Sequence, residues 1–245
     1  MNLDNIVIVL CRPEESRNVG AVCRAMANNG IHTLRIVGKK EDFDEERVRI
    51  LAIHSAYIWE NAAFYDSITE ATADCACAAG TTRRKGKKRF KLQLPEDFAQ
   101  SADSVTGNGG KVAVVFGNER TGLTDEETDQ CTTGITIPSS PDFASLNLSH
   151  AVQIMCYHLF RTNRSDISGC TPITLERLDK TVESIADSLQ EIGFFSVTGR
   201  PDMEQFWRTI LSRAALSEKE AQYVEHVFNK AAGFSKKHAG HNGNP

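Results

Sequence analysis

The stretch VAVVFGNERTGLTDEETDQCTTGITIPSSPDFASLNLSHAVQIMCYHLF, residues 112–160, organises the whole chain. It opens with the apolar run Val112 to Phe116, which is long enough for one buried strand and too short for a helix. A polar loop bounded by Gly117 and Gly122 follows. A second apolar run, residues 135–137, leads through a loop rich in Ser and Pro into a long apolar-periodic helix. In an open α/β sheet, ligands bind outside the carboxyl ends of the strands, so these two strand ends predict a binding site.

The residues before this stretch alternate between strand and helix patterns. The run 6–10 predicts a buried strand, 18–29 a helix that ends before Gly30, and 33–37 a second strand. This rhythm is typical of a βαβ unit and a parallel sheet. Further strands are expected at 61–65 and 75–82, and further helices at 43–60, 67–74 and 96–105.

The pattern changes after residue 160. Amphipathic helices are predicted at 174–192, 201–216 and 217–232, followed by a polar, Gly-rich tail from Gly233 that we expect to be disordered. We therefore divide the chain into an α/β domain, residues 1–164, and a helical C-terminal extension with a disordered tail, residues 165–245. The helices are too few to predict an independent core.

Composition describes an ordinary globular protein. The 245 residues are 40% hydrophobic and 24% charged. The sequence shows neither an apolar run of about 20 residues nor a signal-peptide pattern, so we expect a cytoplasmic protein that does not enter a membrane. The seven cysteines are odd in number and include no C-x-x-C pair, which argues against a disulfide framework or a zinc ribbon. We expect no metal.

Positive charge is concentrated in one segment. The net charge is −4, yet residues 83–91 read RRKGKKRFK, with seven Lys or Arg. Such a concentration indicates a local contact with an anion. A solvated surface loop is the alternative.

Known nucleotide motifs are missing from the sequence. Gly117 and Gly122 have the spacing of P-loop glycines, but Leu123 and Thr124 replace the Lys-Ser/Thr pair. Polar residues instead cluster at the predicted strand ends. Taken singly, each is a cap or turn residue; Asn147, for example, is suited to cap the helix that follows it.

Taken together, three segments carry a family resemblance. They are RNVGAVCRAM at 17–26, VVFGNERTGLTDEE at 114–127 and IPSSPDFASLNLSHAV at 137–152. In order and spacing they resemble the SpoU-type (TrmH/TrmJ) branch of the SPOUT RNA methyltransferases. These enzymes transfer a methyl group from S-adenosylmethionine to a ribose 2′-oxygen. The helical segment with GFF at 193–195 looks most like the TrmJ subgroup, which methylates nucleotide 32 of tRNA.

The resemblance implies a fold and an assembly. The expected fold is α/β, with a mostly parallel sheet and a C-terminal trefoil knot, followed by a small helical segment. General topology rules make a knot a poor guess from the sequence alone. In this family the knot forms the cofactor pocket, and the enzymes are homodimers.

The resemblance also implies roles for individual residues. Arg24 would be catalytic, with Asn18 positioning it or its substrate and Ser145 near the target ribose. The basic segment would clamp RNA phosphates, and the residues expected to contact RNA are Arg84, Lys85, Lys87, Lys88 and Arg89. Arg83 departs from the small residue expected there, so either a cofactor or a phosphate contact is open to it. The residues that would bind S-adenosylmethionine or support its loops are Thr81, Thr82, Arg83, Gly117, Glu119, Gly122, Ile137, Ala144, Ser145, Leu146 and Asn147.

The chemistry leaves alternatives open. A guanidinium is an awkward base because it stays protonated, so Arg24 either acts as a phosphate-assisted base or stabilises the developing alkoxide. The substrate implied is tRNA. Ribosomal RNA is the alternative, and a non-catalytic RNA-binding protein of the same fold is a further one. An unrelated nucleotide-binding enzyme ranks last.

Overall fold

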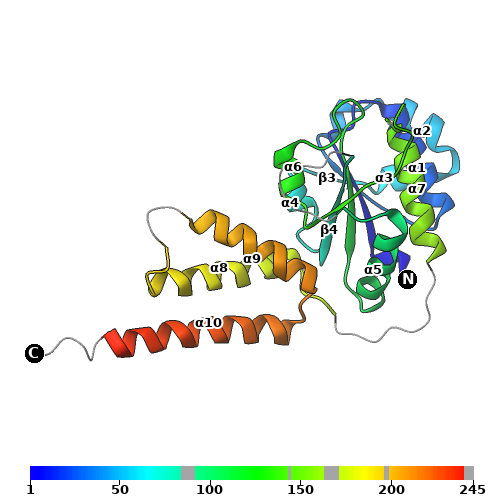
Figure 1. The fold of residues 1–245 in the computed structure, drawn as a ribbon. Coiled ribbons are helices and arrows are strands. Elements are labelled where there is room, and N and C mark those ends of the chain that lie inside the picture. Colours follow the sequence, from blue (N-terminus) through cyan, green and yellow to red (C-terminus); the bar gives the residue numbers. More distant parts are fainter. Residues whose placement is uncertain (84–91, 143–144, 163–170, 196–198, 240–245) are drawn as a thin grey trace, which may run out of the picture.

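The computed structural model describes residues 1–83, 92–142, 145–162, 171–195 and 199–239 (Figure 1). At its centre lies a parallel sheet, as the sequence predicted. Its strands pair in the order β3-β2-β1-β5-β4-β6, so that the order reverses between β1 and β5. They are β1 (Ile6–Cys11), β2 (Thr33–Val37), β3 (Ala63–Tyr65), β4 (Cys77–Thr81), β5 (Val112–Phe116) and β6 (Thr133–Ile135).

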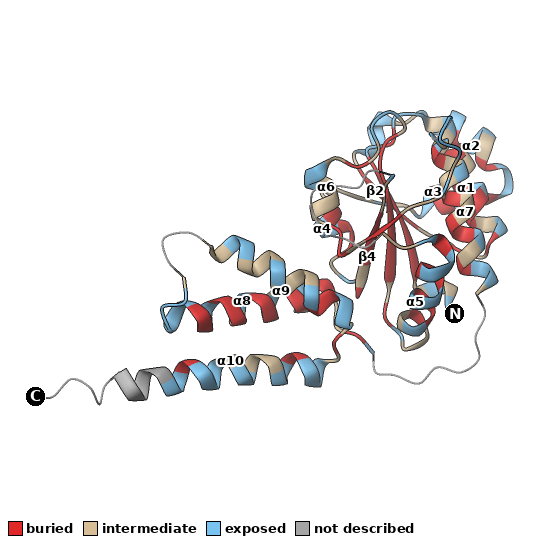
Figure 2. Ribbon diagram, in the orientation of Figure 1, coloured by how far each residue is buried: buried red, intermediate tan, exposed pale blue. Residues whose placement is uncertain are grey.

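One face of the sheet carries most of the helices. Successive strand residues point to opposite faces, and Ile6, Ile8 and Leu10 of β1 point to this one. Helix α1 presents Val19, Val22 and other apolar residues to them. The central strands β1 and β5 are buried along their whole length, and the middle of the sheet is red in Figure 2. The helices of this face are α1 (Ser16–Asn28), α2 (Glu45–Ala52), α3 (Ala56–Glu60), α5 (Pro95–Gly107) and α7 (Leu148–Arg161).

The opposite face joins the C-terminal helices to the sheet. Val7 and Val9 of β1 share one hydrophobic cluster with Leu178 and Val182 of α8 (Leu175–Glu191). The backbone N–H of Leu175 also donates to the carbonyl of Cys75 at 2.7 Å. Two short helices, α4 (Ile68–Ala71) and α6 (Asp125–Asp129), lie on this side as well (Figure 1). The C-terminal helices therefore pack on the α/β domain, in keeping with the expectation that they are too few to form a core of their own.

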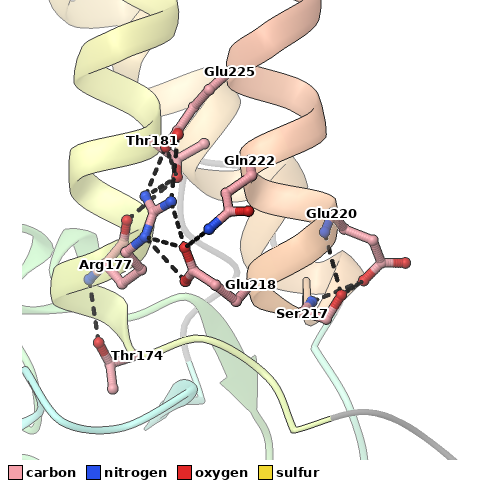
Figure 3. Close-up of polar contacts among 8 residues, drawn as sticks. All are labelled: Thr174, Arg177, Thr181, Ser217, Glu218, Glu220, Gln222 and Glu225. Atoms are coloured by element: carbon pink, nitrogen blue, oxygen red, sulfur yellow. Dashed lines mark hydrogen bonds and ion pairs between the residues drawn. The ribbon is translucent and has the colours of Figure 1, made fainter.

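A polar cluster fixes the C-terminal helices to one another. Arg177 of α8 donates to Glu218 and Glu225 of α10 (Glu218–Ala239), with nitrogen–oxygen distances of 2.9 and 2.6 Å (Figure 3). Thr181 donates to the same Glu225 carboxylate at 2.7 Å. Helix α9 (Arg200–Ala214) completes the group, where Trp207 packs edge-on against Phe228. Partly exposed ion pairs and aromatic contacts thus hold three helices together beside the sheet.

Two predicted elements differ from the structure. The helix expected over 43–60 is interrupted by a 3-10 turn, Ile53–Ser55, because Ile53 has φ +53 and ends α2. A positive φ is strained for a β-branched residue, so no periodicity pattern predicts it. The tail expected to be disordered from Gly233 was also wrong at its start, since α10 continues through Gly233 to Ala239.

Two further features concern cysteines and hydropathy. Within the part of the chain that the structure describes, all six cysteines are free thiols. Among the same residues, the helices are either too short or too polar to cross a bilayer.

Candidate active site

A pocket of about 230 Å³ opens at the carboxyl ends of β4, β5 and β6. It lies beside the point where the strand order reverses, which is where ligands bind in open parallel sheets. The end of β4, the loop after β5, the segment after β6 and the start of α7 all contribute to its wall. The lining residues are Thr81, Thr82, Arg83, Asn118, Glu119, Arg120, Thr121, Gly122, Leu123, Ile137, Ser145, Leu146 and Ala151.

The loop after β5 folds tightly back on itself. A Cβ on Gly117 would lie 2.0 Å from the carbonyl carbon of Gly122 and 2.1 Å from the backbone nitrogen of Leu123. Asn118 closes the turn, because its side-chain oxygen accepts from the backbone and the hydroxyl of Thr121, both at 2.8 Å. Only glycine fits at position 117. At this position the loop therefore presents backbone atoms rather than a side chain.

The strand end of β4 supplies a second backbone wall. The Thr81 hydroxyl donates to the carbonyl of Val115 at 3.0 Å, so it serves to hold β4 against β5. The backbone N–H of Thr82 donates to the carbonyl of Ile135 at 2.8 Å. Thr81 and Thr82 therefore line the pocket while their polar groups also tie neighbouring strands together.

A chain of side chains links the three sequence motifs. The Glu119 carboxylate accepts from the backbone N–H groups of Glu14 and Glu15, at 2.9 and 3.3 Å, and from the Asn18 amide at 2.9 Å. The Asn18 oxygen in turn accepts from the Asn147 amide at 3.0 Å. Glu119, Asn18 and Asn147 come from different motifs, so this chain fixes the motifs relative to one another.

The two asparagines have different local roles. Asn147 is the N-cap of α7, as the sequence suggested, and its side-chain oxygen accepts from the Ser149 backbone at 2.8 Å. Asn18 lies inside α1, whose N-cap is Glu15, and its side chain is committed to Glu119 and Asn147. Asn18 therefore does not cap α1 but connects the first motif to the other two.

A second carboxylate, Glu127 of α6, lies near the end of β1. It accepts from Arg12 Nε at 2.6 Å and from the Cys11 thiol at 3.2 Å. Burial, together with this carboxylate, raises the pKa of the Cys11 thiol to about 12. Burial opposes ionisation of Glu127 too, but the hydrogen bonds from Arg12, Thr124 and Cys11 outweigh it and lower the pKa of Glu127.

Arg24 is the predicted site residue that lies apart from this pocket. It is exposed on the outward stripe of α1, in register with Arg17, Ala21 and Asn28. It is not among the residues that line the pocket. Its guanidinium makes no hydrogen bond or ion pair with the residues described in the structure. In a single chain, Arg24 is thus free to engage a substrate or a second protomer.

The other predicted residues divide into three groups. Gly117, Asn18 and Asn147 are not lining residues themselves but belong to the loop and the hydrogen-bond chain beside the pocket. Glu119, Gly122, Ile137, Ser145 and Leu146 lie around the pocket together with the β4 residues. Ala144 and the predicted RNA contacts lie outside the described residues; these contacts are Arg84, Lys85, Lys87, Lys88 and Arg89.

Five residues of the pocket wall were not among the predicted site residues: Asn118, Arg120, Thr121, Leu123 and Ala151. Leu123 carried a usable signal, because a lone apolar residue between Gly122 and a polar helix start must pack against something. Ala151 carried a weaker one, since it lies one turn into α7 and faces the loops that precede this helix.

Comparisons with known proteins agree with this geometry. The model of the SpoU rRNA Methylase family matches residues 5–157. A tRNA (cytidine-2′-O-)-methyltransferase TrmJ of Methanocaldococcus jannaschii is 36% identical over 155 residues, which are 63% of this chain and 67% of that protein. A tRNA (cytidine/uridine/adenosine-2′-O-)-methyltransferase TrmJ of Pseudomonas aeruginosa is 28% identical over 93% of this chain and 94% of its own length.

A solved structure extends the likeness to the C-terminal helices. The crystal structure of TrmJ from Z. mobilis superimposes with a TM-score of 0.75 at 28% identity, covering 92% of this chain and 98% of that one. Because the match covers 92% of the chain, it extends beyond the α/β domain into the helical extension. The chain belongs to the SpoU rRNA methylase family.

Proposed function

We propose that this protein transfers a methyl group from S-adenosylmethionine to the 2′-oxygen of a ribose in tRNA, at nucleotide 32 of the anticodon loop. The observation that carries the proposal is the pocket at the ends of β4, β5 and β6, joined through Glu119, Asn18 and Asn147 to the first helix. The names of the relatives that match along most of the chain support a tRNA substrate. Such an enzyme would work in the cytoplasm.

The polar and apolar groups that line the pocket are of the types that the proposed cofactor needs. Backbone groups of the Gly117–Gly122 loop and of Thr81 and Thr82 offer donors and acceptors, while Ile137 and Leu146 offer apolar surface for an adenine ring. The close approach at Gly117, where a Cβ would collide with the loop, leaves the wall bare of side chains. When bound, the cofactor supplies a methyl group already activated by its sulfonium. The protein then has to align the acceptor oxygen with it.

Ser145, Asn18 and Arg24 are proposed to act on the ribose side. Ser145 is exposed at the pocket, where its hydroxyl can contact the substrate. Arg24 would activate the 2′-hydroxyl with a substrate phosphate, or stabilise the alkoxide as it forms. The loss of one such donor costs about 10²–10³ in rate.

A homodimer is part of the proposal. The outward stripe of α1 that bears Arg24 adjoins α7, and Tyr157 and Phe160 of α7 expose about half of their surface. A second copy covering this apolar surface would bring Arg24 of one protomer toward the pocket of the other. The trefoil knot and the division into residues 1–164 and 165–245 also stay predictions, although the C-terminal helices share a hydrophobic cluster with the sheet.

The test is methyl transfer from labelled S-adenosylmethionine to total tRNA and to ribosomal RNA. The proposal predicts transfer to tRNA by the wild-type protein and loss of at least 100-fold for Arg24→Ala, with cofactor binding retained. Transfer to ribosomal RNA alone would favour the second candidate, which the description of the family model suggests. Binding of RNA without transfer would identify a non-catalytic member of the fold.

RNA contacts by residues 83–91 have their own test. If the segment makes about six phosphate contacts, RNA affinity falls on the order of 10³-fold between 50 and 200 mM salt. Replacing Lys85, Lys87, Lys88 and Arg89 with serine should flatten this dependence. An unchanged slope would assign the segment to the solvated surface.

A further inference from the structure

The turn that follows β1 has an unusual backbone. Arg12 has φ +51, a left-handed conformation that costs an L-residue free energy and persists only where its surroundings hold it. Two contacts hold it here. Its backbone N–H donates to the carbonyl of Val37 at 3.0 Å, and its Nε donates to Glu127 at 2.6 Å. The guanidinium is half exposed, but the Glu127 carboxylate that it meets is only 13% exposed.

Glu127 ties this turn to the loop that walls the pocket. One of its oxygens accepts from Arg12 and from the Cys11 thiol, while the other accepts from the Thr124 backbone at 2.8 Å. Thr124 lies directly after Leu123, a lining residue of the pocket. One carboxylate therefore joins the end of β1 to the end of the pocket loop.

The same loop holds the other end of the segment 12–18. Glu119 accepts from the backbone N–H groups of Glu14 and Glu15 and from the Asn18 side chain. Between these points, Arg120 forms an ion pair with Glu14 at 2.6 Å. Segment 12–18 is thus held at one end by Glu127 of α6 and at the other by Glu119 of the pocket loop, and it includes the first turn of α1, the helix that bears Arg24.

We propose that Arg12 and Glu127 are positioning residues for methyl transfer. The strained turn held by Glu127 sets the path of segment 12–18, and this path places Asn18 and the start of α1 against the cofactor loop. Neither side chain touches the reacting atoms. This inference rests on the proposed function. It adds Arg12, which lies outside the three motifs, to the machinery of the site, and it gives a role to Glu127 at the end of the second motif.

Two variants test the pair directly. Arg12→Gly accepts the positive φ but lacks the guanidinium, and Glu127→Gln keeps an acceptor for the Thr124 backbone but lacks the charge that Arg12 meets. We expect each to lower kcat by about 10- to 100-fold, because a misplacement of about 1 Å has effects of that size. The Kd of S-adenosylmethionine and the KM for tRNA should change by less than about 3-fold. The double variant should be no worse than either single one, because both changes remove the same contact.

A second readout does not depend on activity. In the wild-type protein the amides of Glu14 and Glu15 are hydrogen-bonded to Glu119, so both variants should speed hydrogen exchange at these two amides. Arg208→Gln is the matched control, since Arg208 Nε donates to Asp179 at 2.7 Å among the C-terminal helices. It should leave kcat and the exchange of Glu14 and Glu15 unchanged.

The outcomes separate the possible failures. If Arg12 contacted RNA instead, Arg12→Gly would raise the KM for tRNA. It would also flatten the dependence of RNA affinity on salt concentration by the amount expected for about one phosphate contact. Glu127→Gln would leave both the KM and this dependence unchanged. That result would overturn the positioning role, as would wild-type kcat in both variants. A wild-type protein that transfers no methyl group to RNA would overturn the proposed function itself.

Discussion

Gly117→Ala should abolish cofactor binding through backbone collision alone. The new Cβ would lie 2.0 Å from the Gly122 carbonyl carbon, 2.1 Å from the Leu123 nitrogen and 2.5 Å from the Gly122 oxygen. All three atoms belong to the backbone, so no change of rotamer relieves the contact. Carbon atoms pack at about 3.5–4.0 Å, and the loop must therefore open by about 1.5 Å.

Opening the loop has a cost that the structure allows us to estimate. Overpacking of this kind destabilises by about 1–3 kcal/mol. The hydrogen bond from the Gly122 N–H to the Asn118 carbonyl, at 3.0 Å, is lost as well and contributes about 1 kcal/mol. Because the loop is also the wall of the pocket, we expect the Kd of S-adenosylmethionine to rise at least 100-fold, which corresponds to about 2.7 kcal/mol.

Isothermal titration with S-adenosylmethionine measures this effect, and urea unfolding measures stability in parallel. Gly20→Ala is the control for general destabilisation, since its Cβ would lie 2.2 Å from the Val48 carbonyl oxygen, between α1 and α2 and away from the pocket. It should lower stability and leave the Kd of the folded protein unchanged. Gly122→Ala is the control for backbone strain without collision, because its φ is +68 and its Cβ would meet open space. A Gly117→Ala protein that binds with wild-type affinity would refute the assigned pocket.

Other predictions concern stability. The Arg35 guanidinium, assisted by Lys111, holds the pKa of Asp74 well below its usual value, so the carboxylate stabilises the fold above the unfolded-state pKa and loses this effect as pH falls. For this half-exposed group we expect wild type and Asp74→Asn to differ in unfolding free energy by about 1 kcal/mol. This difference should be constant above about pH 5 and shrink below about pH 4. A difference that does not depend on pH would count against the ion pair. A double-mutant cycle of Arg177→Met and Glu225→Gln should give a coupling of about 1 kcal/mol in urea unfolding, and additive effects would show that the contact in Figure 3 does not fix α8 to α10.

The sheet and most helices could be predicted because they follow simple periodicity. The run at residues 6–10 became β1, Ile6–Cys11, and the run at 112–116 became β5. Asn147 was suited to an N-cap and is one. The break at Ile53 could not be predicted, since its positive φ arises from tertiary packing rather than from the residue type. The extension of α10 through Gly233 also contradicts the local sequence, because glycine usually ends a helix.

The position of the pocket could be predicted, but the hydrogen bonds that join its loop to the first helix could not. Strand ends and glycines marked the loop 117–122, and the structure places that loop opposite Ile137 and Leu146. The hydrogen bonds from Glu14 and Asn18 to Glu119 join residues about a hundred positions apart, and a single sequence holds no signal for them. The sequence likewise holds no signal for the left-handed backbone conformation of Arg12.

The position of Arg24 shows a further limit. A motif places a residue on a helix, but which face meets the pocket depends on how that helix packs. In this chain α2 and α7 cover two sides of α1, and Arg24 lies on the side left open. In the proposed dimer, this open side would face the partner, so we expect Arg24→Ala in one protomer of a mixed dimer to impair only one of the two sites.

The most direct test of the central claim uses a tRNA with a single atom removed. A tRNA that carries 2′-deoxyribose at nucleotide 32 lacks the proposed acceptor oxygen and keeps every other contact. The account predicts one labelled methyl group per unmodified tRNA, none on the 2′-deoxy-32 tRNA, and equal binding of both. Full transfer to the 2′-deoxy-32 tRNA would contradict the proposed acceptor, and no transfer to either tRNA would contradict the proposed tRNA methyltransferase activity.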